Sequence, residues 1–169
     1  MTEDTILDIL LIEDEMSSTL LIERLKSEFH EKVNIYRNGH TIAKDLEFFT
    51  DKDLDVVILD EQYSDLNIID AVKLIKKKKP EASVIVLTNE KENALVDKVR
   101  SAGAFDYVIK DKSTVDKVVY ALKGLWGSKF VKTENVRLKA STKSSRTTLT
   151  ILILVVLLII AGAIYYFTR

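Results

Sequence analysis

The sequence contains no cysteine and only one proline among its 169 residues. The absence of cysteine excludes a disulfide framework and any thiolate metal site. No phosphate-binding loop of the Gly-Lys type is present, so nothing points to an NTPase of that class. The first five residues are polar and acidic, and they predict no signal peptide. His30 and His40 lie in no pattern typical of an acceptor histidine, and both are expected at the surface.

One long apolar segment lies near the C-terminus, at residues 149–167. It has no charged residue and no proline, and thirteen of its nineteen residues are Leu, Ile, Val or Phe. Nineteen helical residues rise about 28 Å, close to the ~30 Å hydrocarbon core of a bilayer. A buried core helix in a small domain would normally keep a polar stripe, which this segment lacks. The segment is therefore predicted to be a transmembrane helix.

Residues 127–148 are rich in Ser, Thr and Lys and show no sustained apolar period. They are expected to form a flexible linker. Against one acid, Glu134, the linker carries six basic residues: Lys129, Lys132, Arg137, Lys139, Lys143 and Arg146. Because basic residues flank the cytoplasmic ends of membrane spans, residues 1–126 are predicted on the cytoplasmic side of a membrane crossed once. Contact of the linker with anionic lipid is an alternative, but the spread of its charges favours a solvated tether.

Residues 6–126 alternate short apolar runs with amphipathic segments. Five strands are predicted from the Val-, Ile- and Leu-rich runs at 6–12, 33–36, 55–59, 84–87 and 107–109. Such near-continuous runs are typical of parallel strands buried on both faces. The segments between them have helical spacing, with Gly103 expected to end the fourth helix and Ser113 to Asp116 resembling a capping box for the fifth. The pattern predicts an α/β domain in which helices cover both faces of a parallel sheet.

Polar residues follow four of the predicted strands: Glu13 and Asp14 the first, Asp60 the third, Thr88 the fourth and Lys110 the fifth. In open α/β sheets, ligands bind beyond the carboxyl ends of the strands, near the switch in strand order. In the flavodoxin-like order 2-1-3-4-5, the first and third strands are neighbours at that switch. The three carboxylates are then expected to share one pocket.

Three carboxylates that close together are unfavourable by themselves. At an effective dielectric near 20, two unit charges 4 Å apart repel by about 4 kcal/mol. A hard divalent cation reverses this, and an open oxygen site suits Mg²⁺. A carboxylate beside Mg²⁺ can attack a phosphoryl group, with Lys110 pairing to a phosphate oxygen and Thr88 donating to it. Each residue alone is more typical of a turn, cap or surface position, but their joint placement favours a phospho-acceptor site.

These motifs resemble those of the response-regulator receiver family over about residues 6–126. The motif LLIEDE matches the family's acidic pair, here Glu13 and Asp14, and VVILDEQYSDLN matches the strand that bears the phospho-acceptor, here Asp60. The motif VIVLT places the switch hydroxyl at Thr88. The motif GAFDYVIK places the switch aromatic at Tyr107 and the lysine at Lys110. The resemblance implies Mg²⁺-dependent phosphoryl transfer from a histidine kinase or phosphotransfer protein. It also implies that the backbone carbonyl of Gln62 ligates the metal, and that the face around the fourth helix, fifth strand and fifth helix reports phosphorylation.

Several positions depart from the family pattern. Glu13 stands where Asp is more usual, and Ser64 and Ile68 replace the Pro and Gly of the loop after the acceptor. Asp111 replaces the Pro after the lysine, and Asn89 is larger than the residue usual after the switch hydroxyl. The positions that tune the lifetime of the acyl phosphate hold Gln62 and Glu90. No core group is lost, so the departures bear on the rate and lifetime of phosphorylation.

The prediction is a membrane-tethered receiver of a two-component phosphorelay that accepts a phosphoryl group on Asp60. It is not expected to be an enzyme beyond its own Mg²⁺-dependent phosphorylation and dephosphorylation. Output is expected through protein contact, including a phosphorylation-dependent homodimer, and not through nucleic acid, because the linker and span occupy the residues after Trp126. The alternative is a receiver-like scaffold that docks a partner at the membrane without phosphorylation. A haloacid-dehalogenase-like hydrolase is disfavoured because Gln62 stands where that pattern has a second acid.

Overall fold

The computed structural model describes residues 6–13, 15–37, 41–49, 51–91 and 93–167. Within these ranges, side chains are described except at residues 15–17, 63, 93, 137, 140–149, 151–152 and 154–167. The chain divides into two compact units, Met1–Gly127 and Ser128–Arg169. Each is described here by itself.

The first unit is built on a five-stranded parallel sheet in the order β2-β1-β3-β4-β5. Its strands are β1 (Leu7–Ile12), β2 (Val33–Arg37), β3 (Val56–Asp60), β4 (Ser83–Thr88) and β5 (Asp106–Ile109). The predicted strands and their order are confirmed, with ends that differ by at most one residue. The central strand β3 is buried along its whole length, as its apolar run requires.

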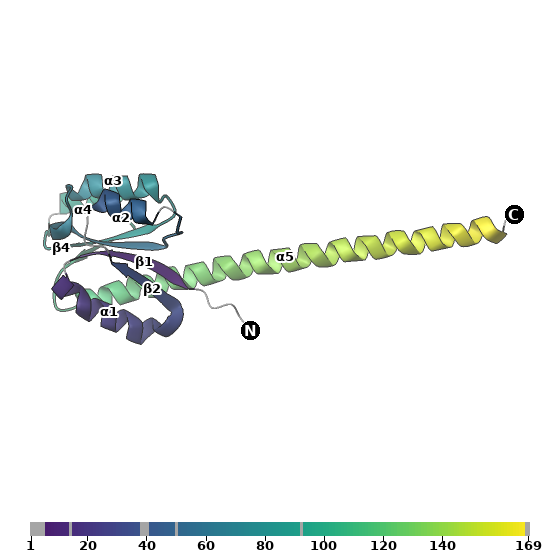
Figure 1. The fold of residues 1–169 in the computed structure, drawn as a ribbon, viewed down its shortest axis with the longest axis horizontal. Helices are drawn as coiled ribbons and strands as arrows, with labels where there is room; N and C mark the ends of the chain where they lie inside the picture. Colours follow the sequence, from purple (N-terminus) through teal and green to yellow (C-terminus); the bar gives the residue numbers. More distant parts are fainter. Residues whose placement is uncertain (1–5, 14, 38–40, 50, 92, 168–169) are drawn as a thin grey trace. The chain divides into compact units, whose positions relative to one another are not determined.

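Helices cover both faces of this sheet (Figure 1). They are α1 (Glu15–Phe29), α2 (Ile42–Phe48), α3 (Ile68–Lys78), α4 (Asn93–Ser101) and α5 (Thr114–Phe167). Side chains alternate along each strand, so that Leu10 of β1 packs with α2 and α3 while Leu11 packs with α1 and α5. Two apolar cores result, one on each face, and together they hold the strand ends in fixed register.

The helix ends follow from local sequence. Asn67 caps α3 by accepting a hydrogen bond from the backbone of Asp70 at 3.0 Å. Helix α4 ends in the turn around Gly103, whose φ of +107° suits glycine. There Ala104 N donates to Val99 O at 3.2 Å and Gly103 N to Arg100 O at 2.9 Å, the paired bonds of a Schellman motif. The expectation that Gly103 ends the fourth helix is therefore confirmed.

Helix α5 is longer than the sequence pattern predicts, because it continues from the first unit through residue 167. Residues 127–148, which were expected to form a flexible linker, have a helical backbone. The physical reason lies in the composition: the segment lacks proline and holds Lys, Arg, Leu, Ala and Glu, all of which favour the helix. Exposed apolar side chains on this stretch include Val131, Val136 and Leu138.

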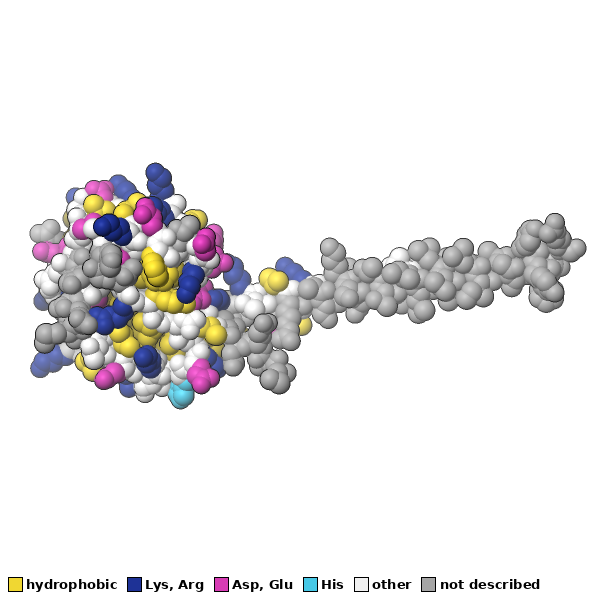
Figure 2. Space-filling model, viewed as in Figure 1, with side chains coloured by type: hydrophobic (Ala, Val, Ile, Leu, Met, Phe, Trp, Pro, Cys, Tyr) yellow, Lys and Arg dark blue, Asp and Glu magenta, His cyan; other side chains and the backbone are white. Residues whose placement is uncertain are grey.

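Within the described part of the chain, no helix contains a stretch long and apolar enough to cross a bilayer. The backbone of the predicted transmembrane segment, residues 149–167, is helical. Most of its side chains lie outside the described residues, so the predicted span stays a prediction. On the face of the first unit seen in Figure 2, acidic and basic side chains are interspersed around a central apolar area.

Candidate functional site at the carboxyl edge of the sheet

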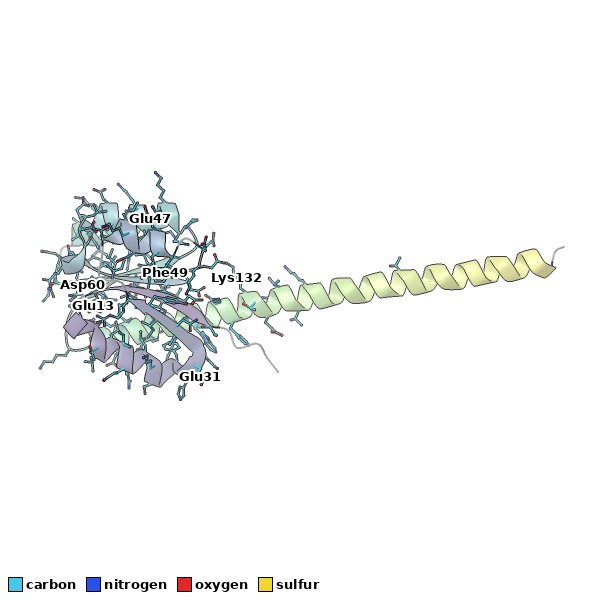
Figure 3. The ribbon with its side chains drawn as sticks, in the orientation of Figure 1. Glu13, Glu31, Glu47, Phe49, Asp60 and Lys132 are labelled. Carbon is cyan, nitrogen blue, oxygen red and sulfur yellow. The ribbon has the colours of Figure 1, made fainter. Side chains whose placement is uncertain are left out.

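The strand register brings the predicted polar residues to one edge of the sheet. Ile12 pairs with Leu59, so Glu13 and Asp60 follow a matched pair on neighbouring strands. Thr88 pairs with Ile109, and Lys110 comes directly after that pair. Figure 3 shows Glu13 and Asp60 near one another at the same end of the unit. Parallel pairing therefore gathers residues that lie far apart in the sequence.

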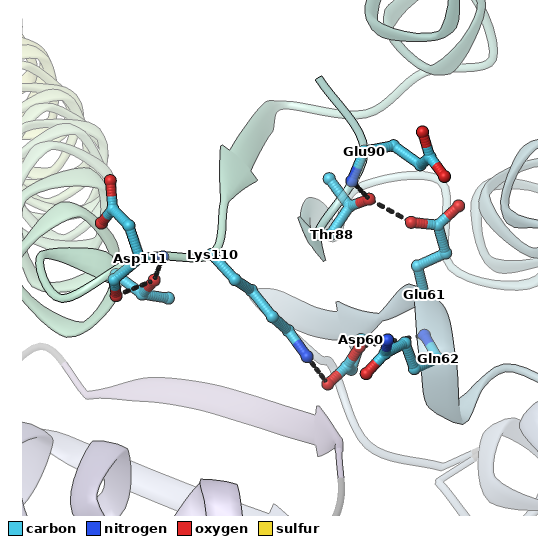
Figure 4. Close-up of polar contacts among 8 residues, drawn as sticks. Asp60, Glu61, Gln62, Thr88, Glu90, Lys110 and Asp111 are labelled. Atoms are coloured by element: carbon cyan, nitrogen blue, oxygen red, sulfur yellow. Dashed lines mark hydrogen bonds and ion pairs between the residues drawn. The ribbon is translucent and has the colours of Figure 1, made fainter. Parts of the chain in front are cut away.

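Asp60 is buried, with 2% of its surface exposed. Its Oδ1 accepts a hydrogen bond from the backbone N–H of Gln62 at 3.0 Å, and its Oδ2 forms an ion pair with the Lys110 ammonium (Figure 4). Lys110 is held in place because its own N–H donates to Thr88 O at 2.7 Å, which extends the pairing of β4 and β5. A buried carboxylate needs such partners, since an unpaired buried charge is strongly destabilising.

Thr88, at the end of β4, is fully buried, and its hydroxyl is hydrogen-bonded in both directions. Thr88 Oγ1 accepts from the backbone N–H of Glu90 at 2.9 Å and donates to the carboxylate of Glu61 (Figure 4). Tyr107 joins the same cluster, since its hydroxyl donates to the carbonyl oxygen of Glu90 at 3.1 Å. The predicted switch pair, Thr88 and Tyr107, thus meets at the short loop after β4.

The electrostatics of this cluster are visible in Tyr107. Burial raises the pKa of its hydroxyl above the usual value; the hydrogen bond with Thr88 acts in the opposite direction, and the carboxylates of Glu61 and Glu90 raise the pKa further. Both acids therefore lie close enough to influence the Tyr107 ring. Neither effect was evident from sequence, because Glu61 and Glu90 belong to different loops.

The predicted metal ligands are only partly described. Asp14 lies outside the described residues, and among those that are described no three acids, histidines or cysteines form a metal-binding group. Glu13 is partly buried at the end of β1, beside Asp60. Gln62 lies in the 3₁₀ turn η2 (Glu61–Tyr63), directly after the acceptor strand. This donor set consists of carboxylate and carbonyl oxygens, which fits a hard cation such as Mg²⁺.

Sequence reasoning missed a role for Asp111, which it treated only as a departure from the family pattern. Its Oδ1 accepts from Ser113 N and its Oδ2 pairs with Lys117 Nζ, both at 2.8 Å. These bonds, led by those from Lys117 and Ser113, lower the pKa of Asp111 from 3.8 to about 2. The Ser113 hydroxyl also donates to Asp111 at 2.6 Å. Asp111 therefore organises the start of α5, in place of the capping box expected from Ser113 and Asp116.

The fold and this edge define a class: an α/β domain with a buried acid–lysine pair beyond the carboxyl ends of its strands. Residues 9–122 match the family model described as "Response regulator receiver domain". The chain belongs to this family, and it contains the receiver domain of a two-component response regulator. Receiver domains are phospho-acceptor signalling domains and not true enzymes.

Related proteins agree with this assignment. An NtrX-like response regulator of Rickettsia felis is 30% identical over 138 residues, which cover 79% of this chain and 28% of that protein. This chain thus spans little more than a quarter of the length of that curated relative.

Solved structures share the fold. NtrX from Brucella abortus in complex with ADP has a TM-score of 0.61 at 20% identity, over 79% of this chain and 29% of that one. A response regulator from Thermotoga maritima has a TM-score of 0.60 at 16% identity, over 72% and 98%. The beryllofluoride-activated NtrC4 receiver domain dimer has a TM-score of 0.62 at 20% identity, again over 72% and 98%.

Proposed function

We propose that Asp60 accepts a phosphoryl group from a phosphohistidine of a histidine kinase or phosphotransfer protein. The observation that carries this proposal is the Asp60 carboxylate, which is buried at the end of β3 and paired with Lys110. An acid used only for turn formation would more commonly be exposed. The family to which the chain belongs uses an acid at this place in the same way.

In the proposed step, one carboxylate oxygen of Asp60 attacks the phosphorus of the donor. The new O–P bond forms while the donor N–P bond breaks, and its electron pair stays on the imidazole, which takes a proton from solvent. The product is an acyl phosphate on Asp60. Lys110, already beside this carboxylate, pairs with a phosphoryl oxygen and offsets the added negative charge. Thr88 lies within the same edge and supplies a hydroxyl donor.

The proposed site includes Mg²⁺, held by Glu13, Asp14, Asp60 and the backbone carbonyl of Gln62. When bound, the ion neutralises charge on the phosphoryl oxygens and on the crowded acids. The all-oxygen donor set supports this proposal. In this proposal the acids supply the charge, and Gln62, whose backbone N–H donates to Asp60 from the 3₁₀ turn after β3, would supply its carbonyl.

Output is proposed through the face formed by α4, β5 and α5. Thr88 moving toward the phosphoryl group would release space near Tyr107, whose hydroxyl is held by Glu90. On that face, Tyr120 of α5 lies beside β5 and is 82% exposed. We propose that phosphorylation biases this surface between two states and so controls a protein partner or a homodimer. The NtrC4 structure is an activated receiver dimer, which supports the homodimer among these outcomes.

A membrane tether is part of the proposal. The uncharged segment at residues 149–167 supports a single span in the cytoplasmic membrane, and the basic residues at 129–146 support a receiver on the cytoplasmic side. The full chain is expected to fractionate with membranes and to resist carbonate extraction. A protease added outside intact cells should leave residues 1–126 uncut. Cleavage there, or recovery of the full chain in the soluble fraction, would contradict this part of the proposal.

The phospho-acceptor function is tested with the full chain and beryllofluoride, a phosphoryl analogue. With Mg²⁺ present, ¹⁹F NMR should show a bound beryllofluoride signal, and amide shifts should appear near Asp60, Thr88 and Lys110 and at Tyr107. Asp60→Asn is the control and should bind none. If the wild type also binds none at millimolar Mg²⁺, the receiver-like scaffold without phosphorylation becomes the better description.

A further inference from the structure

The single proton of the Thr88 hydroxyl is already donated to a partner in this structure. The hydroxyl accepts from the backbone of Glu90 and donates its single proton to the carboxylate of Glu61. A hydroxyl has only one proton to donate. If Thr88 is to donate to a phosphoryl oxygen on Asp60, its bond to Glu61 must first be given up.

Glu61 is built into this position by the local backbone. It directly follows the acceptor Asp60 and opens the 3₁₀ turn η2, which begins where β3 ends. Figure 4 shows the Glu61 side chain directed toward Thr88, while the Asp60 side chain is directed toward Lys110. Asp60 therefore contacts Lys110, directly after β5, while Glu61 contacts Thr88 at the end of β4.

Charge adds to this competition. A phosphoryl group brings additional negative charge and new acceptor oxygens to Asp60. The Glu61 carboxylate is then a like charge that occupies the hydroxyl the phosphoryl group requires. Lys110, the basic partner of this cluster, is paired with Asp60 and not with Glu61. Among the described residues, Glu61 forms no ion pair with a Lys or Arg side chain that would offset this repulsion.

We propose that Glu61 is an intramolecular competitor that holds Thr88 in the unphosphorylated arrangement and so opposes the switch. This inference rests on the proposed phospho-acceptor function and deepens it. Phosphorylation exchanges one acceptor of the Thr88 proton for another, from the Glu61 carboxylate to a phosphoryl oxygen, while the bond from Glu90 N is retained. Glu61 is a positioning residue, because it acts through Thr88.

The test compares beryllofluoride affinity of the full chain and its variants by ¹⁹F NMR titration at fixed Mg²⁺. Glu61→Ala removes both charge and acceptor and should tighten binding about tenfold, a ratio typical of losing one hydrogen bond to a charged group. Glu61→Gln keeps an acceptor oxygen for Thr88 and should tighten binding only about threefold through the lost charge. Asp53→Asn, which removes one exposed acid before β3 at the opposite edge, should leave the affinity unchanged.

A double mutant separates competition for Thr88 from simple charge repulsion. In a Thr88→Ala background, Glu61→Ala should tighten binding no more than Glu61→Gln does in the wild type. An undiminished gain in that background would overturn the competition model, as would Glu61 variants that bind equally or more weakly than the wild type. Melting temperatures of each variant verify that the chain remains folded. Absence of binding in the wild type would instead refute the phospho-acceptor function itself, so the two failures are distinguishable.

Discussion

The two edges of the sheet contain similar polar residues but use them differently. At the amino edge, Asp55 accepts from the backbone N–H of Asp8 at 2.8 Å, and Asp8 accepts from the Tyr36 hydroxyl at 2.8 Å. At the carboxyl edge, Asp60 pairs with the side chain of Lys110, and Thr88 donates to that of Glu61. The Asp55 side chain at the amino edge satisfies a backbone group and so joins β1 to the start of β3. At the carboxyl edge, Asp60 and Thr88 each accept a hydrogen bond from one backbone N–H and also bond to a side chain, that of Lys110 or Glu61.

This difference indicates where chemistry can occur. A side chain that satisfies a buried backbone group cannot leave without cost, because the backbone group would be left unpaired. A side chain paired with another side chain can exchange its partner for a ligand that offers equivalent bonds. Lys110 and Thr88 can therefore transfer their side-chain bonds to a phosphoryl group, whereas Asp55 is committed to the fold.

The largest expected effect separates the two edges directly. Asp60→Asn should abolish phosphorylation by a small acyl phosphate donor, because the nucleophilic oxygen is lost. The same variant should change the free energy of unfolding by only about 1 kcal/mol, since Asn can still accept a hydrogen bond from Gln62 N. Asp55→Ala should leave phosphorylation intact and cost about 1 kcal/mol through the bond from Asp8 N. Phosphate-affinity gels and urea unfolding measure the two quantities. Phosphorylation of the Asp60→Asn variant at the wild-type level would contradict the assignment of the acceptor.

Lys110→Met should have the next largest effect, on stability. It leaves the nearly buried Asp60 without its cation, and we expect a loss of about 2 kcal/mol in metal-free buffer. This is below the ~3–5 kcal/mol typical of a fully buried pair, because the Lys110 side chain is 21% exposed. Added Mg²⁺ should recover part of the loss. The matched control is Lys117→Met, which breaks the exposed pair with Asp111 and should have a smaller effect. If urea unfolding shows equal losses in the free energy of unfolding for the Lys110 and Lys117 variants, burial does not distinguish the two ion pairs.

A smaller effect is expected at the amino edge, in the turn before β5. Gly103→Ala should cost about 1–2 kcal/mol, because an L-residue is strained at this left-handed φ. The added Cβ would also meet Lys76 Cγ at 3.0 Å, and the Lys76 ammonium donates to the backbone carbonyls of Pro80 and Ala82. Beryllofluoride affinity should be unchanged. A loss of affinity comparable to that of a site variant would mean that the two edges are coupled.

The smallest effect concerns pH and the start of α5. The folded pKa of Asp111, about 2, is below its ordinary 3.8, so its contribution to stability is present above pH 3.8 and is lost as the pH falls toward 2. Asp111→Asn should therefore lower the melting temperature slightly at pH 6, with a difference from the wild type that shrinks near pH 2. Thermal unfolding at several pH values measures this. A difference that stays constant down to pH 2 would show that the charge of Asp111 is not responsible.

Much of the fold could be predicted because strand and helix patterns are local. The apolar runs that became β3 and β4 required burial on both faces, and Gly103 ended α4 as its conformational freedom suggests. The helical backbone of residues 127–148 was not part of the prediction. Their Ser, Thr and Lys content indicated flexibility, but a sequence without proline that contains good helix formers can continue an existing helix.

The sequence by itself determined which residues end each strand, and hence that Asp60, Thr88 and Lys110 would meet at the carboxyl edge. This follows because parallel strands in a known order bring their ends together whatever the side chains do. Only the tertiary structure decided which partners these residues take. Glu61 contacts Thr88, and Asp60 pairs with Lys110, because of the directions of these side chains and the spacing of neighbouring strands. The directions and the spacing are set by packing between segments distant in the chain, and no local sequence pattern encodes them.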